Sequence, residues 1–208
     1  MDSDDSDLAR VKEFFGKQGH RIVYAVLALV IAAGGGYFYT RYQARQVQNA
    51  AGLYNEMLGA AMQHRFRLAV AAGQKLEKSY RSTAYAGLGA LLLARVANDE
   101  NKLPMAEASL QFAAHHGRPR IVRTVARLRL AAVLVAEGHP RKAYRWTRIG
   151  AQPGFKGQVL ALRAQILARE HHPRQAAKAY TQAIALTSKK SPMHRLLELE
   201  RAQLAVTS

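Results

Sequence analysis

The sequence predicts an all-α protein in which one membrane-spanning helix precedes a solenoid of paired antiparallel helices. Three observations predict this class: an uncharged run near the N-terminus, a proline–alanine pattern that recurs along the chain at a nearly constant interval, and a composition rich in helix-forming residues. Hydrophobic residues make up 49% of the 208 residues, which is enough for a sizeable core. The alternating β-branched runs that indicate strands are missing.

The uncharged run, residues 22–39, is the predicted transmembrane helix. Its 18 residues would rise roughly 27 Å as a helix, close to the hydrocarbon thickness of a bilayer. Aromatic residues flank the run, as they do at membrane interfaces; these are Tyr24, Tyr37, Phe38, Tyr39 and Tyr42. Two alternatives are a cleaved signal peptide with its apolar region at 22–33 and a buried helix of a soluble protein. The long, initially acidic segment 1–21 favours a retained anchor over a signal peptide.

Basic residues predict the orientation of this anchor. Four precede it closely (Arg10, Lys12, Lys17 and Arg21), whereas two follow it (Arg41 and Arg45). The positive-inside rule therefore predicts that residues 1–21 are cytoplasmic and that the domain at 40–208 is exported.

The formal net charge of +17 lies entirely in the C-terminal part of the chain. Residues 1–42 hold five basic and five acidic side chains, which cancel. The excess beyond them predicts attraction to anionic lipid, acidic polypeptides or nucleic acid, or else a solvated bias toward Arg. The chain has no cysteine, which excludes disulfides and thiolate metal sites without deciding the compartment.

The recurring pattern predicts tetratricopeptide-like repeats, whose period is about 34 residues. Ala106, Ala143 and Ala176 each follow a proline closely, and the two intervals between them bracket that period; the alanines at 94, 131 and 164 precede them by a constant offset. Small residues are expected where paired helices cross closely, and each proline is expected to begin the second helix of its pair. We expect helices at 42–63, 66–79, 82–97, 104–115, 120–137, 140–149, 156–170, 173–187 and 192–206. The first two would form an atypical pair, and Leu196, Leu199 and Leu204 of the last would cover the end of the array.

The N-terminal region carries a resemblance to a known family. Val11-Lys12, Phe14-Phe15 and Gly19 stand just before a glycine-containing span, and divergent repeats make up the rest of the chain. In this layout, over nearly its whole length, the chain resembles the YfgM family of ancillary subunits of the bacterial SecYEG translocon. The N-terminal motif with its span is the specific part of the resemblance, because the repeats alone are generic. The chain departs from the family in its strong basicity.

The resemblance implies a location and partners. It implies a single-pass inner-membrane protein with a cytoplasmic N-terminus and a periplasmic repeat domain. It further implies association with SecYEG and with the periplasmic chaperone PpiD. The implied role is to help translocated client proteins leave the translocon and fold.

Motifs for catalysis or for cofactor binding are missing from the sequence. Gly34-Gly35-Gly36 lies inside the span, and neither a Gly-x-Ser-x-Gly nor a His-Glu-x-x-His motif occurs. The pairs His115-His116 and His171-His172 are adjacent, whereas helical metal ligands prefer a spacing of three or four, so we expect helix capping or exposure. Trp146 is expected to pack between helices. We therefore expect no enzyme activity, cofactor or metal, and no individual binding residue is predicted.

Two functions remain. The first is a protein-interaction scaffold with a concave groove, where Arg and Lys would favour acidic or extended polar clients. The second is a basic envelope protein that binds an anionic polymer or lipid surface through two dense basic stretches. Without interleaved aromatic residues, specific nucleic-acid recognition is not expected. The stretches are Arg118, Arg120, Arg123, Arg127 and Arg129, then Arg141, Lys142, Arg145 and Arg148.

Overall fold

The computed structural model describes the backbone of residues 3–148 and 153–207, and every element within these ranges is helical. Side chains at 3–23, 25, 26, 33, 153 and 205–207 lie outside the description. The chain divides into two compact units, Met1–Gln48 and Asn49–Ser208. The second unit carries the repeats.

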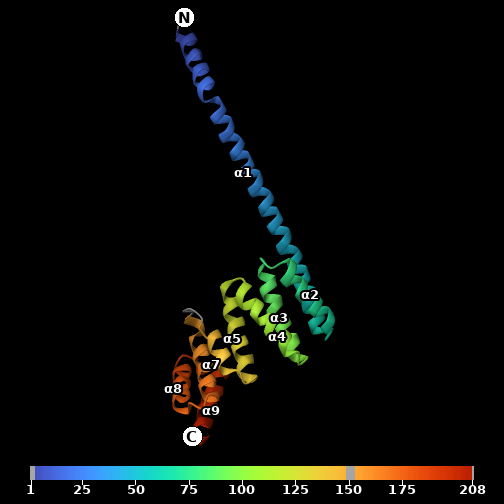
Figure 1. Ribbon diagram of the computed structural model, residues 1–208, viewed down its shortest axis with the longest axis vertical. Helices are drawn as coiled ribbons and strands as arrows, with labels where there is room; N and C mark the ends of the chain where they lie inside the picture. The colour runs from blue at the N-terminus through green and yellow to red at the C-terminus, as the bar shows by residue number, and fades with distance from the viewer. Residues whose placement is uncertain (1–2, 149–152, 208) are drawn as a thin grey trace. The chain divides into compact units, whose positions relative to one another are not determined.

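The first helix, α1, runs from Ser3 to Met62 (Figure 1). The predicted span, 22–39, lies on it, and part of the span and all of segment 1–21 fall outside the described side chains. Among the residues that are described, no helix is long and apolar enough to cross a membrane. The span therefore stays a prediction. Its described apolar side chains are exposed, with Leu29, Ile31 and Phe38 at 70%, 66% and 75%.

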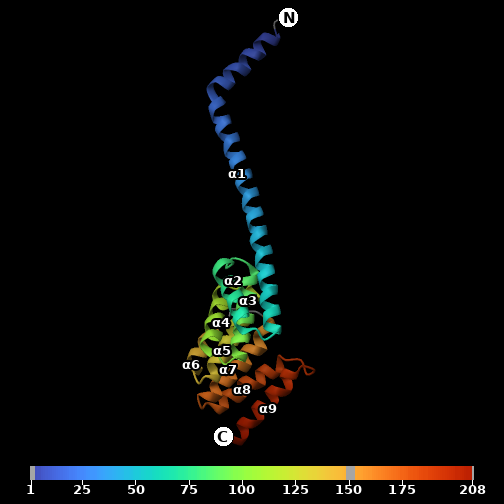
Figure 2. The same cartoon turned by 90° about the vertical axis from the view of Figure 1, so that its right-hand side faces the viewer.

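The second unit consists of helices packed in sequential pairs (Figures 1 and 2). We call the first member of each pair an A helix and the second a B helix. The A helices are residues 49–62 of α1, α3 (Ala84–Asp99), α5 (Arg120–Ala136) and α7 (Lys156–Arg169). The B helices are α2 (Phe66–Ser79), α4 (Leu103–His116), α6 (Pro140–Trp146) and α8 (Pro173–Ala185). A 3₁₀ turn, η1 (Pro153–Phe155), precedes α7, and α9 (Pro192–Thr207) follows α8 in the position of a further A helix.

The small-residue positions predicted from the sequence form the core. Ala94, Ala131 and Ala164 on the A helices are at most 4% exposed, and so are their B-helix partners Ala106, Ala143 and Ala176. Small side chains at a crossing let the two backbones approach, so larger neighbours along each helix can interdigitate. Prolines 104, 140 and 173 lie in the first turn of their B helices, as predicted. The missing N–H costs no hydrogen bond at that position.

The turn inside each pair has the same geometry in all four pairs. One residue adopts a left-handed conformation, with φ between 55° and 79°: His64, Asn101, Gly138 and His171. The next residue's N–H then donates to a carbonyl five positions earlier, at 2.7–2.9 Å. This is the Schellman arrangement, which satisfies carbonyls at a helix end that would otherwise lack donors.

The first pair, which the sequence predicts as an atypical pair, follows the register of a full repeat. His64 precedes Ala69 by five positions, as Asn101 precedes Ala106, and Ala69 is fully buried. The crossing position on its A helix is Met57, a large side chain with no exposed area. The added volume is offset on α2, because Gly73 stands where the other B helices have Leu110, Thr147 and Tyr180. A Cβ at Gly73 would lie 3.0 Å from Met57 Cε.

Two expectations about the later helices are wrong. Helix α6 ends at Trp146 rather than at residue 149, and residues 149–152 lie outside the described residues. On α9, Leu197 is 1% exposed and Leu204 packs on the last core cluster, but Leu196 and Leu199 are 48% and 58% exposed. Leu197 therefore takes the buried position predicted for Leu196, whereas Leu204 packs as predicted.

Candidate functional site

Consecutive A helices form a face with two pockets. The first pocket lies between the end of α1 and α3, and the second lies among α5, α7 and α9. The side chains on this face belong to the side of each A helix that is turned away from its own B helix. The face is therefore the natural candidate for a binding groove in a stacked array.

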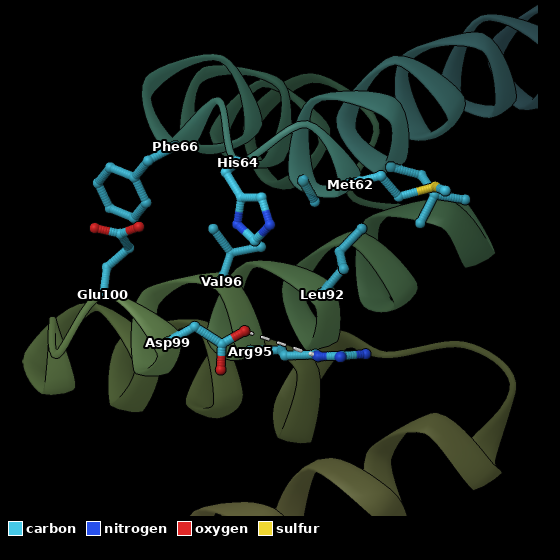
Figure 3. A pocket seen from close by; sticks show the side chains of 10 residues that line it. Met62, His64, Phe66, Leu92, Arg95, Val96, Asp99 and Glu100 are labelled. Carbon is cyan, nitrogen blue, oxygen red and sulfur yellow. Dashed lines mark ion pairs between the residues drawn. The ribbon is translucent and has the colours of Figure 1, made fainter.

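The first pocket has a volume of about 450 Å³ and a mostly apolar lining (Figure 3). Helix α1 contributes Leu58, Ala61 and Met62, and α3 contributes Leu92 and Val96. Met62 is 74% exposed and Leu58 is 38% exposed. An apolar surface of this kind left open to water is typical of sites that bind a partner.

Polar groups lie at one end of the first pocket. Figure 3 shows His64 pointing toward Val96 and Phe66 lying beside Glu100. Arg95 Nε lies 3.9 Å from Asp99 Oδ2, and the two side chains are 77% and 64% exposed. This exposed ion pair contributes little to stability and leaves both groups open to a ligand.

The charged residues that line the first pocket carry more negative than positive charge. Asp99 and Glu100 outnumber Arg95 here, although the chain as a whole is strongly basic. In the second pocket Arg169 is matched by Glu200. Arg and Lys therefore do not predominate among the charged residues that line either pocket. The first pocket suits an apolar segment flanked by a basic residue.

The second pocket contains a partly buried polar network that connects α9 to the helices beside it. The amide of Gln165 on α7 donates to the Glu200 carboxylate at 3.1 and 3.3 Å. Tyr180 of α8 is 3% exposed and also hydrogen-bonds Glu200. Burial raises the pKa of Tyr180, and the charge and hydrogen bond of Glu200 raise it further. One carboxylate thus connects α7, α8 and α9.

Arg163 has a structural role that sequence reasoning missed. Its Nε donates to Thr147 Oγ1 at 3.2 Å, and its Nη2 donates to the Thr147 carbonyl at 3.3 Å. Its guanidinium also lies over the Tyr144 ring. Thr147 is fully buried and is the C-cap residue of α6. The donors therefore satisfy a helix end that α6 leaves in the interior.

The side chains of the first basic stretch differ in exposure, whereas those of the second stretch are all exposed. Arg118, Arg120 and Arg129 are exposed, as are the basic residues of the second stretch. Arg123 is half-buried and donates to the Gly117 carbonyl at 2.9 Å. Arg127 is also half-buried, and its Nε lacks a partner. The first stretch therefore has some cationic side chains exposed to solvent and others partly buried between helices.

The histidine pairs and the tryptophan lie where helices end or pack. Trp146 packs partly buried against the core, as predicted, with the His115 ring 5.6 Å from its own. His116 contacts Arg81. Desolvation lowers the pKa of His116, and the charges of Arg81 and His115 lower it further. A charged imidazole at His116 is therefore disfavoured, although a helix C-terminus by itself favours positive charge. His171 forms the turn before α8, and His172 is the N-cap residue of that helix.

Stacked helix pairs, a common turn and an open face of A helices define a helical-repeat scaffold, a class that binds other proteins. The chain belongs to the tetratricopeptide repeat-like domain family, whose family model matches residues 12–206. A comparison with curated proteins finds no match.

Proposed function

We propose that this protein is a non-catalytic, membrane-anchored scaffold that holds other proteins in its A-helix groove. The observation that carries the proposal is the first pocket, where Leu58 and Met62 leave an apolar surface open between the first two A helices. Repeat families of this kind usually bind partners through such faces rather than catalyse reactions.

The membrane anchor is residues 22–39. Its exposed leucine, isoleucine and phenylalanine side chains support this assignment, because a helix with exposed apolar residues on many sides is stable in lipid and costly in water. We place residues 1–21 in the cytoplasm and residues 40–208 in the periplasm of a bacterium. A periplasmic activity reporter fused after Ser208 tests this topology: an active reporter supports it, and an inactive one contradicts it.

The partners we propose are the SecYEG translocon, the chaperone PpiD and translocated client proteins. The N-terminal resemblance to the YfgM family supports this choice, and the anchor would hold the groove near the exit of the translocon. The first pocket would take apolar segments of clients before they fold, since such segments are exposed only at that stage.

Crosslinking in native membranes tests these partners, and point variants test the pocket. Met62→Asp puts a charge into the pocket, and Leu68→Asp, on α2, serves as the control because both parent side chains are largely exposed. We expect Met62→Asp to reduce recovery of client proteins at least tenfold, with Leu68→Asp unchanged. Equal losses in both variants would refute the pocket, and recovery of no translocon subunit by the parent chain would refute the partners.

A further inference from the structure

The connections from each B helix to the next A helix are basic throughout. Four sequence stretches contain these connections and have no acidic residue: 78–98, 108–136, 138–169 and 171–197. Within them, seven exposed cationic side chains lie in the connections or at the first residue of the A helix that follows. We call these residues the basic edge: Arg81, Arg118, Arg120, Arg148, Lys156, Lys189 and Lys190.

The turns inside each pair have a different composition. They carry the acidic residues Asp99, Glu100, Glu137 and Glu170, and Arg141 there lies 3.9 Å from Glu170. Successive helices of the array run in opposite directions and α5 contacts both α3 and α7, so the two kinds of connection lie at opposite ends of the helices. The repeat domain therefore has one basic edge and one edge of mixed charge.

The chain enters the array at its basic edge. Residues 49–62 of α1 form the first A helix, so the array begins at the N-terminal ends of the A helices. The proposed anchor ends at Tyr39, and segment 40–48 connects it to Asn49. A helical connection of that length spans roughly 15 Å. This short tether keeps the edge through which the chain enters within reach of the membrane surface.

We propose that the basic edge docks on an anionic phospholipid bilayer, an inference that rests on the anchor in the proposed function. Its cations come from separate connections, so a broad charged surface engages them together, whereas a peptide in the groove does not. Attraction to such a surface acts over about one Debye length, roughly 8 Å at physiological salt. The described aromatic residues in these connections, Tyr80 and Phe155, are half-buried, so single-stranded nucleic acid would lack an exposed stacking platform.

Two single-cysteine reporters test the docking, because the chain has no cysteine of its own. Ser82→Cys labels the basic edge in the connection before α3, and Asn98→Cys labels the far end of α3; both positions are exposed. The full chain is reconstituted into nanodiscs of phosphatidylcholine, with or without phosphatidylglycerol, that contain an acceptor-labelled lipid. We expect energy transfer from position 82 to rise with phosphatidylglycerol and to fall with salt, while transfer from position 98 stays low. Transfer from position 82 that does not depend on phosphatidylglycerol overturns the proposal.

Matched charge variants locate the effect. The test variant neutralises four residues of the basic edge: Arg118→Gln, Arg120→Gln, Lys189→Gln and Lys190→Gln. The control removes the same charge from exposed positions early in α6 and α8: Arg141→Gln, Lys142→Gln, Arg174→Gln and Lys178→Gln. Each cation near an anionic surface contributes about fivefold to binding, so the test variant should lose the phosphatidylglycerol response and the control should keep it. Equal responses of the two variants overturn the proposal. Recovery of translocon subunits by crosslinking, measured on the same variants, reports separately on the proposed function.

Discussion

The volume exchange between Met57 and Gly73 predicts that the two positions are energetically coupled. In the later pairs the A helix has the small residue at the crossing and the B helix has the larger residue four positions on. The first pair has the reverse. We therefore expect Met57→Ala and Gly73→Leu to be destabilising singly and to compensate each other in combination.

The structure sets the size of the effect. Met57 has no exposed area, so Met57→Ala should lower the free energy of unfolding by about 3 kcal/mol through lost burial and a cavity. At Gly73, a Cβ already lies 3.0 Å from Met57 Cε and 3.1 Å from Leu93 Cδ2. The remaining atoms of a leucine have no room, which costs about 1–3 kcal/mol, partly offset by about 1 kcal/mol of helix propensity. In the double variant the leucine fills the space that Met57 leaves, so we expect a coupling energy of about 2–3 kcal/mol.

Thermal unfolding of the full chain, followed by circular dichroism in one detergent, measures this coupling. A change of about 1 kcal/mol shifts Tm by about 2–4 °C in a chain of this size, so the double variant should melt several degrees above the sum of the single effects. The exposed position Ala132, on α5, supplies a control in Met57→Ala combined with Ala132→Leu, where additive shifts are expected. Additive shifts for Met57 and Gly73 would refute the assignment of the first pair to the repeat register.

Three further changes test individual contacts. Burial raises the pKa of Glu77 to about 7, above the value in the unfolded chain. The ionised carboxylate therefore destabilises the fold increasingly as the pH rises from about 4.5 to 7. Glu77→Gln should raise the free energy of unfolding by about 1–2 kcal/mol at pH 8, after allowance for partial exposure, and leave Tm unchanged at pH 4. A gain of equal size at both pH values would contradict this origin. Arg163→Met removes both donors to the buried Thr147 and should cost about 1–3 kcal/mol in thermal unfolding, whereas an unchanged Tm would show that the cap is dispensable. Glu200→Gln weakens the hydrogen bond to Tyr180. Amide hydrogen exchange should therefore become faster in α9 while exchange in α5 stays the same. Unchanged exchange in α9 would count against the network.

Much of the repeat region could be predicted because its determinants are local. A proline in the first turn of a B helix and an alanine at each crossing are required by backbone geometry, so they recur in the sequence at the spacing of the repeat. The predicted boundaries of α2, α4, α5, α7 and α8 lie within two positions of the observed ones. The family match over residues 12–206 agrees with this prediction.

Other features depend on contacts between distant residues, which a spacing pattern does not show. The first pair was predicted as atypical, and its repeat register did not show because Phe66 replaces the proline and Met57 replaces the small residue, although the His64-to-Ala69 spacing was a usable signal. Arg163 and Thr147 lie on separate helices, far apart in the sequence, and nothing local indicates that one caps the other. On α9 several leucines were possible contacts, and only docking against α8 selects Leu197 over Leu196.

The sequence could predict which helices line the groove, but not which side chains of those helices reach it. The sequence indicates that A helices line it, whereas its charge depends on which side chains reach the pocket. Asp99 and Glu100 reach the first pocket because they lie at the end of α3, beside the turn that His64 begins. The average charge of the chain therefore does not give the charge of this pocket.

Site-specific photocrosslinking in native membranes tests most directly whether the A-helix groove holds proteins. A photoreactive amino acid at Met62 reports on the first pocket, and the same group at Tyr144, which is 47% exposed on the B helix α6, reports on the outer face. We predict that position 62 crosslinks to client proteins during active translocation and that position 144 does not. Crosslinks at position 144 with none at position 62 would contradict the account.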